Sequence, residues 1–304
     1  MLPNFGATVS AQRIPFARRT VQAGLAGLWL SLGAASALGA TIRDDQPESS
    51  YRNLALRPEY ACVGTFVNDW GYTGSATLIA PGWVLTGAHL FTGASAGTFT
   101  LNGASYPSSQ LVSHPNWRST DKFAGYDFGL ARLATPITSV TPAALYAGSA
   151  ELGLAGTFVG FGMTGTGLTG YRTLDNQKRA FQNMVDGNFG NPTMVLGSDF
   201  DNPHSPADNG FGEPTPLTLE GAVAPGDRGG GVFVTLDGNF YLAGVTSFVA
   251  ATDGSPNSDY GDFSGFGRVS AVGLWINSVV PEPSSFTLLG LGLGLLAWRS
   301  GRRG

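Results

Sequence analysis

The sequence predicts an all-β protein, and three observations lead to this fold class. Its apolar runs are short, rich in β-branched or aromatic residues, and separated by Gly, Asn, Ser and Pro. No long stretch repeats apolar residues at the 3.6-residue period of a helix. The chain has 45 Gly among 304 residues and only 12% charged residues, a composition typical of exported β-rich proteins. Short strands at this spacing favour a sandwich or a barrel.

The expected strands fall into two lobes. A polar lead over residues 41–58 precedes the first strands, and a proline- and alanine-rich passage over 135–153 connects the lobes. We therefore assign 41–150 to a first β domain with its lead segment, and 151–279 to a second β domain. The clearest strand patterns cover 61–67, 75–80, 83–86, 98–101, 179–185 and 193–196.

Composition excludes several functional classes. A net charge of −4 gives no basic surface for nucleic acid, so we predict no nucleic-acid partner. Cys62 is the only cysteine, which rules out an intrachain disulfide, and its apolar context predicts a buried strand residue rather than a nucleophile. The glycines of 156–165 lack the following helix and acidic residue of a dinucleotide-binding loop, and we predict no cofactor.

A polar insert over 197–216 separates the later strands. It carries enough side-chain oxygens to suggest a calcium site, at Asp199, Asp201, Asn202, Asp208 and Asn209. Their spacing does not fit an EF-hand loop, so the preferred interpretation is a solvated loop with no metal. His204 lies in the same insert and is predicted to be exposed.

Residues 1–40 have the organisation of an export signal. Basic residues that include Arg18 and Arg19 precede an apolar run over 23–38, and Ala35-Ser36-Ala37 offers a small-residue cleavage pattern. The arginine pair leaves a twin-arginine signal open, but ordinary secretion is the preferred interpretation. An anchored N-terminal helix is the alternative, and small residues interrupt the apolar run that it would need.

Three separate motifs resemble the trypsin/chymotrypsin family of serine proteases. The segment SATLIAPGWVLTGAH at 75–89 is similar to the hairpin that delivers the catalytic histidine, here His89. The segment YDFGLARL at 126–133 is similar to the strand that supplies the buried aspartate, here Asp127. The segment GDRGG at 226–230 is similar to the nucleophile loop Gly-Asp-Ser-Gly-Gly, with Arg228 at the serine position.

The resemblance runs with gaps from about residue 63 to 276 and implies further roles. It implies two six-stranded Greek-key β-barrels and a short C-terminal helix near Leu274-Trp275-Ile276. Backbone amides of Gly226 and Arg228 would form the oxyanion hole. Ser247 would support the aspartate, Phe248 would follow it along the substrate-binding strand, and Ala222 would form the floor of the specificity pocket. His114, beside a proline, is predicted to lie in a surface loop without a catalytic role.

Arg228 has the largest consequence for function. A guanidinium stays protonated and offers no lone pair for attack, and residues 225–231 contain no Ser, Thr or Cys to replace it. We therefore expect a protease homologue that binds polypeptides and does not cut them. Two alternatives remain: an active serine endopeptidase whose working residue 228 is Ser, and a structural cell-surface or matrix protein.

The charged side chains of this loop need partners. The Arg228 guanidinium has two candidate partners for an ion pair, Asp127 and a carboxylate of a ligand. In the family, the position of Asp227 pairs with a new N-terminus formed by activation cleavage, and Ile42 is the candidate for that terminus.

Residues 280–304 resemble the PEP-CTERM sorting signal of Gram-negative bacteria. Val280-Pro281-Glu282-Pro283 is followed by an apolar run over 286–298 and by a basic end that includes Arg302 and Arg303. The resemblance implies transient anchoring in the inner membrane, with the arginines in the cytoplasm. It also implies cleavage by an exosortase-type sorting enzyme, and release to the cell surface or the extracellular space. A plain C-terminal anchor is the alternative.

Overall fold

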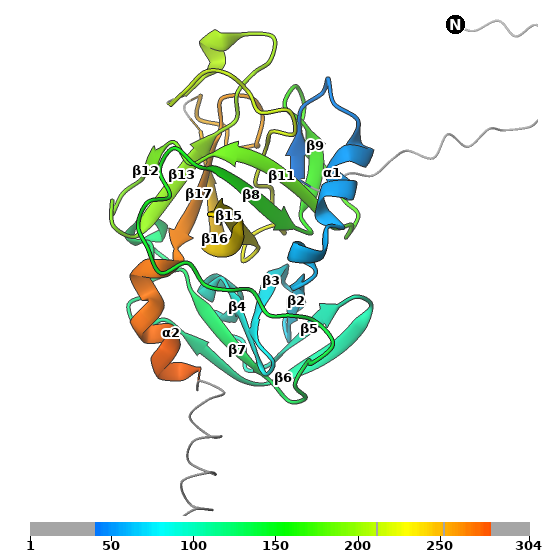
Figure 1. The fold of residues 1–304 in the computed structure, drawn as a ribbon, viewed down its shortest axis with the longest axis vertical. Coiled ribbons are helices and arrows are strands. Elements are labelled where there is room, and N and C mark those ends of the chain that lie inside the picture. Colours follow the sequence, from blue (N-terminus) through cyan, green and yellow to red (C-terminus); the bar gives the residue numbers. More distant parts are fainter. Residues whose placement is uncertain (1–39, 211, 252, 281–304) are drawn as a thin grey trace, which may run out of the picture. The chain divides into compact units, whose positions relative to one another are not determined.

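The computed structural model describes residues 40–280, apart from 211 and 252 (Figure 1). All described residues belong to one compact unit. The predicted export signal, except for its last residue, and the predicted sorting signal after Val280 lie outside the described residues. Among the residues described, no helix is long and apolar enough to cross a membrane.

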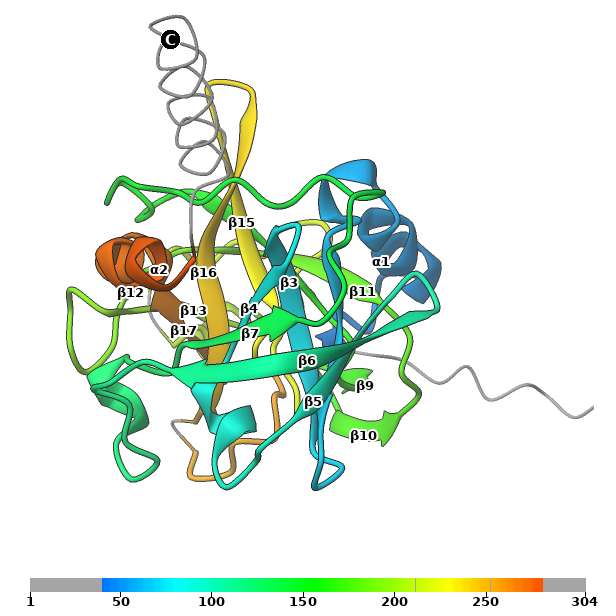
Figure 2. The same cartoon turned by 90° about the horizontal axis from the view of Figure 1, so that it is seen from below.

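The first lobe is a closed barrel, drawn in cyan to green in Figure 2. Its strands follow one another in the order β2 (Val63–Asn68), β3 (Thr73–Ala80), β4 (Trp83–Thr86), β7 (Gly129–Leu133), β6 (Ala104–Ser113) and β5 (Gly97–Leu101). The four strands predicted in this lobe are confirmed to within about two residues at each end. Cys62 is buried just before β2, where burial raises the pKa of its thiol to about 11.

Strand β6 was not predicted, because its sequence ASYPSSQLVS is polar and contains a proline. It pairs with β5 across a tight turn in which Asn102 and Gly103 both have positive φ, at 51° and 79°. An Asn-Gly pair is the strongest short hairpin signal, since both residues tolerate the left-handed region.

The second lobe consists of two sheets rather than one closed six-stranded barrel. The larger sheet has the order β11 (Arg179–Met184), β8 (Ala155–Gly160), β15 (Gly231–Leu236), β16 (Asn239–Ala250), β17 (Phe263–Arg268), β13 (Val195–Asp199) and β12 (Gly187–Asn188). The smaller sheet has the order β10 (Gly170–Leu174), β9 (Met163–Thr166), β1 (Ala40–Ile42) and β14 (Gly221–Ala222).

The lead segment, residues 41–58, packs with this second lobe, although we expected it in the first. Thr41 pairs with Ala222 and Thr164 with Ala40, so β1 completes the smaller sheet. Helix α1 (Glu48–Ala55) follows and buries Tyr51, whose hydroxyl donates to the carbonyl of Glu220 at 2.9 Å. Strand β1 and helix α1 were not predicted because the partners that stabilise them lie far away in the sequence.

Short helices occupy the connections, and α2 (Gly273–Val279) closes the described part, as expected near Trp275. Helices α1 and α2 lie on opposite sides in both views (Figures 1 and 2). The 3₁₀ helices are η1 (Pro58–Tyr60), η2 (Ala88–Phe91), η3 (Lys122–Ala124), η4 (Pro206–Asp208) and η5 (Val269–Val272).

A buried ion cluster holds α1 against the second lobe. The guanidinium of Arg179 is 1% exposed and pairs with Asp175 at 2.8 Å and with Glu48 of α1. A buried charge is costly unless it is paired. Both carboxylates therefore anchor this arginine and, through Glu48, the helix.

The insert over 197–216 is less solvated than predicted. Asp199, Asp201 and Asn202 are buried, and their polar atoms bond to partners inside the segment and beyond it, such as Glu220. The amide of Asn209, for example, donates to Asp201 at 2.7 Å, and the Gly210 N–H donates to Asp199 at 2.6 Å. Residues 40–280, as described, contain no group of three or more His, Cys, Asp or Glu arranged to hold a metal. His204 is exposed, as predicted, and contacts Asp44 at 3.1 Å.

One carboxyl pair in this region should make stability depend on pH. Burial, followed by the negative charge of Asp199, raises the pKa of Asp186 to about 8. The unfolded chain releases this proton near pH 4, about the ordinary pKa of an aspartate, whereas the folded chain retains it. Between about pH 4 and pH 8 the folded state thus binds more protons, and its stability falls as pH rises.

The substitution Asp186→Asn should remove this dependence. We expect it to raise the free energy of unfolding at pH 8 by at least about 1 kcal/mol, with a smaller effect at pH 5. Urea unfolding at the two pH values measures the difference. Asp237→Asn, at an exposed turn residue with positive φ, is the control and should change neither value. An unchanged pH slope in Asp186→Asn would refute the retention of a proton on Asp186 in the folded state.

Candidate active site

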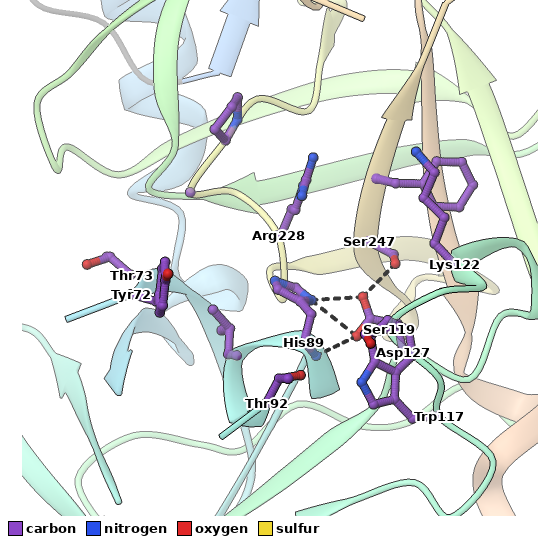
Figure 3. Close-up of a pocket in the computed structure, with 14 residues that line it drawn as sticks. Tyr72, Thr73, His89, Thr92, Trp117, Ser119, Lys122, Asp127, Arg228 and Ser247 are labelled. Atoms are coloured by element: carbon purple, nitrogen blue, oxygen red, sulfur yellow. Dashed lines mark hydrogen bonds and ion pairs between the residues drawn. The ribbon is translucent and has the colours of Figure 1, made fainter. Parts of the chain in front are cut away.

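A histidine and an aspartate meet where the two lobes face each other. The hairpin of β3 and β4 leads into η2, which carries His89, and Asp127 stands just before β7. The His89 Nδ1 lies 2.8 Å from Asp127 Oδ2, and the His89 backbone N–H donates to Asp127 Oδ1 at 2.9 Å. The Ser247 hydroxyl donates to the same carboxylate at 2.6 Å (Figure 3).

These contacts hold the imidazole in one orientation. Burial opposes ionisation of Asp127, but the attraction of His89 and the hydrogen bonds from His89 and Ser247 outweigh it and lower the pKa of Asp127. An ionised carboxylate on Nδ1 keeps the proton there, which leaves Nε2 free to accept another. The pair is therefore arranged as a general base.

The nucleophile loop is fixed by the side chain of Asp227. Its Oδ1 accepts from the Gly162 N–H at 2.7 Å, and its Oδ2 accepts from the Ala224 N–H at 3.0 Å. A Cβ on Gly162 would lie 2.4 Å from the Asp227 carboxylate, so this contact requires glycine. Burial raises the pKa of Asp227 to about 7. Both oxygens already have amide donors, and the candidate terminus Ile42 lies within β1, paired with Gly221.

The loop is also attached to the first barrel. The Ser75 N–H donates to the carbonyl of Arg228 at 3.0 Å, and the Ser75 hydroxyl donates to the carbonyl of Gly226 at 3.0 Å. Gly226 and Gly229 have φ of 98° and 87°, which turns the loop sharply. Within the described residues, the N–H groups of Gly226 and Arg228 have no acceptor. They are the two donors that an oxyanion hole requires.

The Arg228 side chain does not contact the His89–Asp127 pair. Figure 3 shows it extending away from them, and no ion pair or hydrogen bond of its guanidinium occurs in the part of the chain that the structure describes. Its Nε is buried without a partner. The expected alternative in which Arg228 pairs with Asp127 is thus wrong, because Asp127 is fully occupied by His89 and Ser247.

A cavity of about 650 Å³ lies in front of these groups. Aromatic side chains line it at Tyr72, Trp117 and Phe248, and Lys122 reaches it from η3. Ser247 and Gly226 also line it. Ala222 does not line this cavity. It is fully buried and pairs with Thr41, so its assignment as a pocket floor has no support from the cavity.

The described serine and threonine residues that line the cavity do not pair with His89. They are Thr73, Thr92, Ser119 and Ser247. Within residues 40–280, as far as they are described, none of them hydrogen-bonds His89, and the Ser247 hydroxyl is already used by Asp127.

Two features of this region were not foreseen from the sequence. His114 is buried rather than exposed, stacked 4.9 Å from Tyr126 and in edge contact with Trp275, and burial lowers its pKa. Lys122 lines the cavity, although its local sequence Asp121-Lys122-Phe123 carries no signal for this role. Both depend on contacts between segments far apart in the chain.

Known proteins resemble this chain in sequence and in fold. The family model described as Trypsin matches residues 57–276, and the model described as a PEP-CTERM protein-sorting motif matches 279–303. Chymotrypsin-like elastase family member 1 from Rattus norvegicus is 28% identical over 238 residues, covering 70% of this chain and 80% of that protein. The protein of the same name from Homo sapiens is 29% identical over 234 residues, with 69% and 81% coverage.

A solved structure shares the fold. It is neuropsin, described as a serine protease expressed in the limbic system of mouse brain, with a TM-score of 0.53 and 16% sequence identity. The similarity covers 73% of this chain and 96% of that one.

Proposed function

The chain belongs to the trypsin family of serine proteases, and we propose that it binds polypeptides in the cavity beside His89 without cutting them. One observation carries this proposal. Arg228 stands in the loop position from which a nucleophile would reach the substrate. The His89–Asp127 pair, arranged as a general base, and the N–H groups of Gly226 and Arg228 belong to the same site. A guanidinium has no lone pair to attack a carbonyl.

The rest of the site supports polypeptide binding. The cavity combines aromatic side chains, which can contact an extended peptide, with charged and hydroxyl side chains, which can hydrogen-bond it. The loop that supplies the free amides is held by Asp227 and Ser75, so these donors are preorganised for a carbonyl or carboxylate oxygen.

We further propose that the protein acts outside the cytoplasm. The PEP-CTERM motif over 279–303 indicates export and processing by an exosortase-type sorting system. Transient anchoring in the inner membrane and release to the cell surface or the extracellular space would then place the cavity among extracellular polypeptides.

A digest of unrelated proteins tests binding without cleavage. The purified full-length chain is incubated with the digest, and retained peptides are identified by mass spectrometry. We expect a reproducible set of intact peptides, displaced together by an excess of one of them. New peptide termini that depend on His89 would show that the chain cuts. If no peptide is retained, the result would favour the alternative that the chain is a structural cell-surface or matrix protein.

A further inference from the structure

Two cationic side chains at the cavity have no acidic partner among the described residues. Arg228 and Lys122 both line it, and burial, together with the nearby charge of Arg228, lowers the pKa of Lys122. The Lys122 ammonium donates to the carbonyl of Val249 at 3.4 Å and lies 4.9 Å and 5.2 Å from the centres of the Phe248 and Phe123 rings. Neither cation forms an ion pair within residues 40–280, as described.

Among the described residues, no acidic side chain at the cavity is available to these cations. Asp127 is the one acidic residue of the lining in this part of the chain, and its two oxygens accept from His89 and Ser247. The N–H groups of Gly226 and Arg228 add two unpaired donors on the same loop. The Arg228 Nε is buried without a partner, which is unfavourable, and a ligand that supplies negatively charged oxygens would satisfy it together with the Lys122 ammonium and the loop amides.

We propose that the cavity binds a carboxylate of a polypeptide ligand, held by Arg228 and Lys122 with the Gly226 and Arg228 amides beside it. This inference rests on the proposed function and names its ligand class. A free C-terminal carboxylate and an Asp or Glu side chain offer the same chemistry. The aromatic residues Tyr72, Trp117 and Phe248 would contact the remainder of the peptide, which favours a peptide over a small inorganic anion.

Matched peptides test the charge requirement. A fluorescent peptide from the retained set is made in four forms. Its acidic side chains are either kept or replaced by the corresponding amides, and its C-terminus is either free or amidated. Binding to the purified full-length chain is measured by fluorescence anisotropy. We expect the fully amidated form to bind at least about tenfold more weakly than the best carboxylate form. The form that retains affinity identifies which carboxylate is bound.

Variants of the two cationic residues test whether they cause the preference for the carboxylate forms. Arg228→Gln should remove most of the difference between the carboxylate and amidated forms, and Lys122→Gln should reduce it several-fold. Arg172→Gln, on exposed β10 and away from the cavity, is the matched loss of a positive charge and should leave the difference unchanged. Far-ultraviolet circular dichroism confirms that each variant is folded.

The outcomes separate this inference from the proposed function. Equal binding of all four forms, with the peptides intact, would overturn the carboxylate inference and leave the proposed function standing. A preference that persists in Arg228→Gln and Lys122→Gln would place the carboxylate elsewhere and also overturn the inference. Cleavage of the peptide, or binding of none of the forms, would overturn the proposed function itself.

Discussion

Replacement of Arg228 by serine should turn the chain into a peptidase. The serine hydroxyl would stand beside His89, whose Nδ1 is already oriented by Asp127 at 2.8 Å, and between the free amides of the loop. Loss of the nucleophile in such a triad costs about a millionfold in rate, equivalent to about 8 kcal/mol of transition-state stabilisation. We expect a gain of this order in peptide hydrolysis, measured with a fluorogenic peptide whose sequence comes from the retained set.

Two controls make the result specific to the triad. The double variant Arg228→Ser with His89→Ala should lose the gained activity, because no base remains to take the serine proton. Arg228→Ala should show no hydrolysis, because it removes the guanidinium without supplying a nucleophile. If Arg228→Ser is folded and remains inactive, the His89–Asp127 pair and the loop amides do not form a working site.

The second large effect concerns stability rather than chemistry. Arg179→Gln should lower the free energy of unfolding by about 3–5 kcal/mol, because it leaves Asp175 and Glu48 without their buried cation. The loss would also loosen α1 from the second lobe, since Glu48 belongs to that helix. Urea unfolding monitored by tryptophan fluorescence measures the change.

An exposed arginine on the same helix provides the comparison. Arg52 makes one hydrogen bond, to the side chain of Gln177 at 3.2 Å. Arg52→Gln should therefore change the free energy of unfolding by no more than about 0.5 kcal/mol. Equal effects of the two substitutions would show that the buried cluster contributes no more than a surface contact.

Local patterns in the sequence were sufficient for the strands with clear apolar runs and for the pair at the site, but not for β1 or β6. Strand β4 was predicted over 83–86 because the run Trp-Val-Leu-Thr is apolar and bounded by turn residues. His89 and Asp127 were predicted because each lies within a recognisable motif. Their contact at 2.8 Å agrees with the expected pairing of histidine and aspartate.

The features that were missed depend on partners distant in sequence. Thr41 is polar and lies in a polar lead, but it pairs with Ala222 in the second lobe. His114 follows a strand and precedes a proline, yet Tyr126 and Trp275 bury it. Lys122 reaches the cavity only because η3 packs beside the strand that carries Phe248. No local propensity or spacing encodes these contacts.

Active-site labelling with a fluorophosphonate tests the central claim most directly, namely that Arg228 alone disables an otherwise complete site. The reagent is applied to the purified full-length chain and to Arg228→Ser, and intact mass spectrometry counts the adducts. We expect labelling of Arg228→Ser at residue 228 and none of the unmodified chain. Labelling of the unmodified chain would contradict the claim by revealing another nucleophile, and labelling of neither would contradict it by showing that the remaining site is not competent.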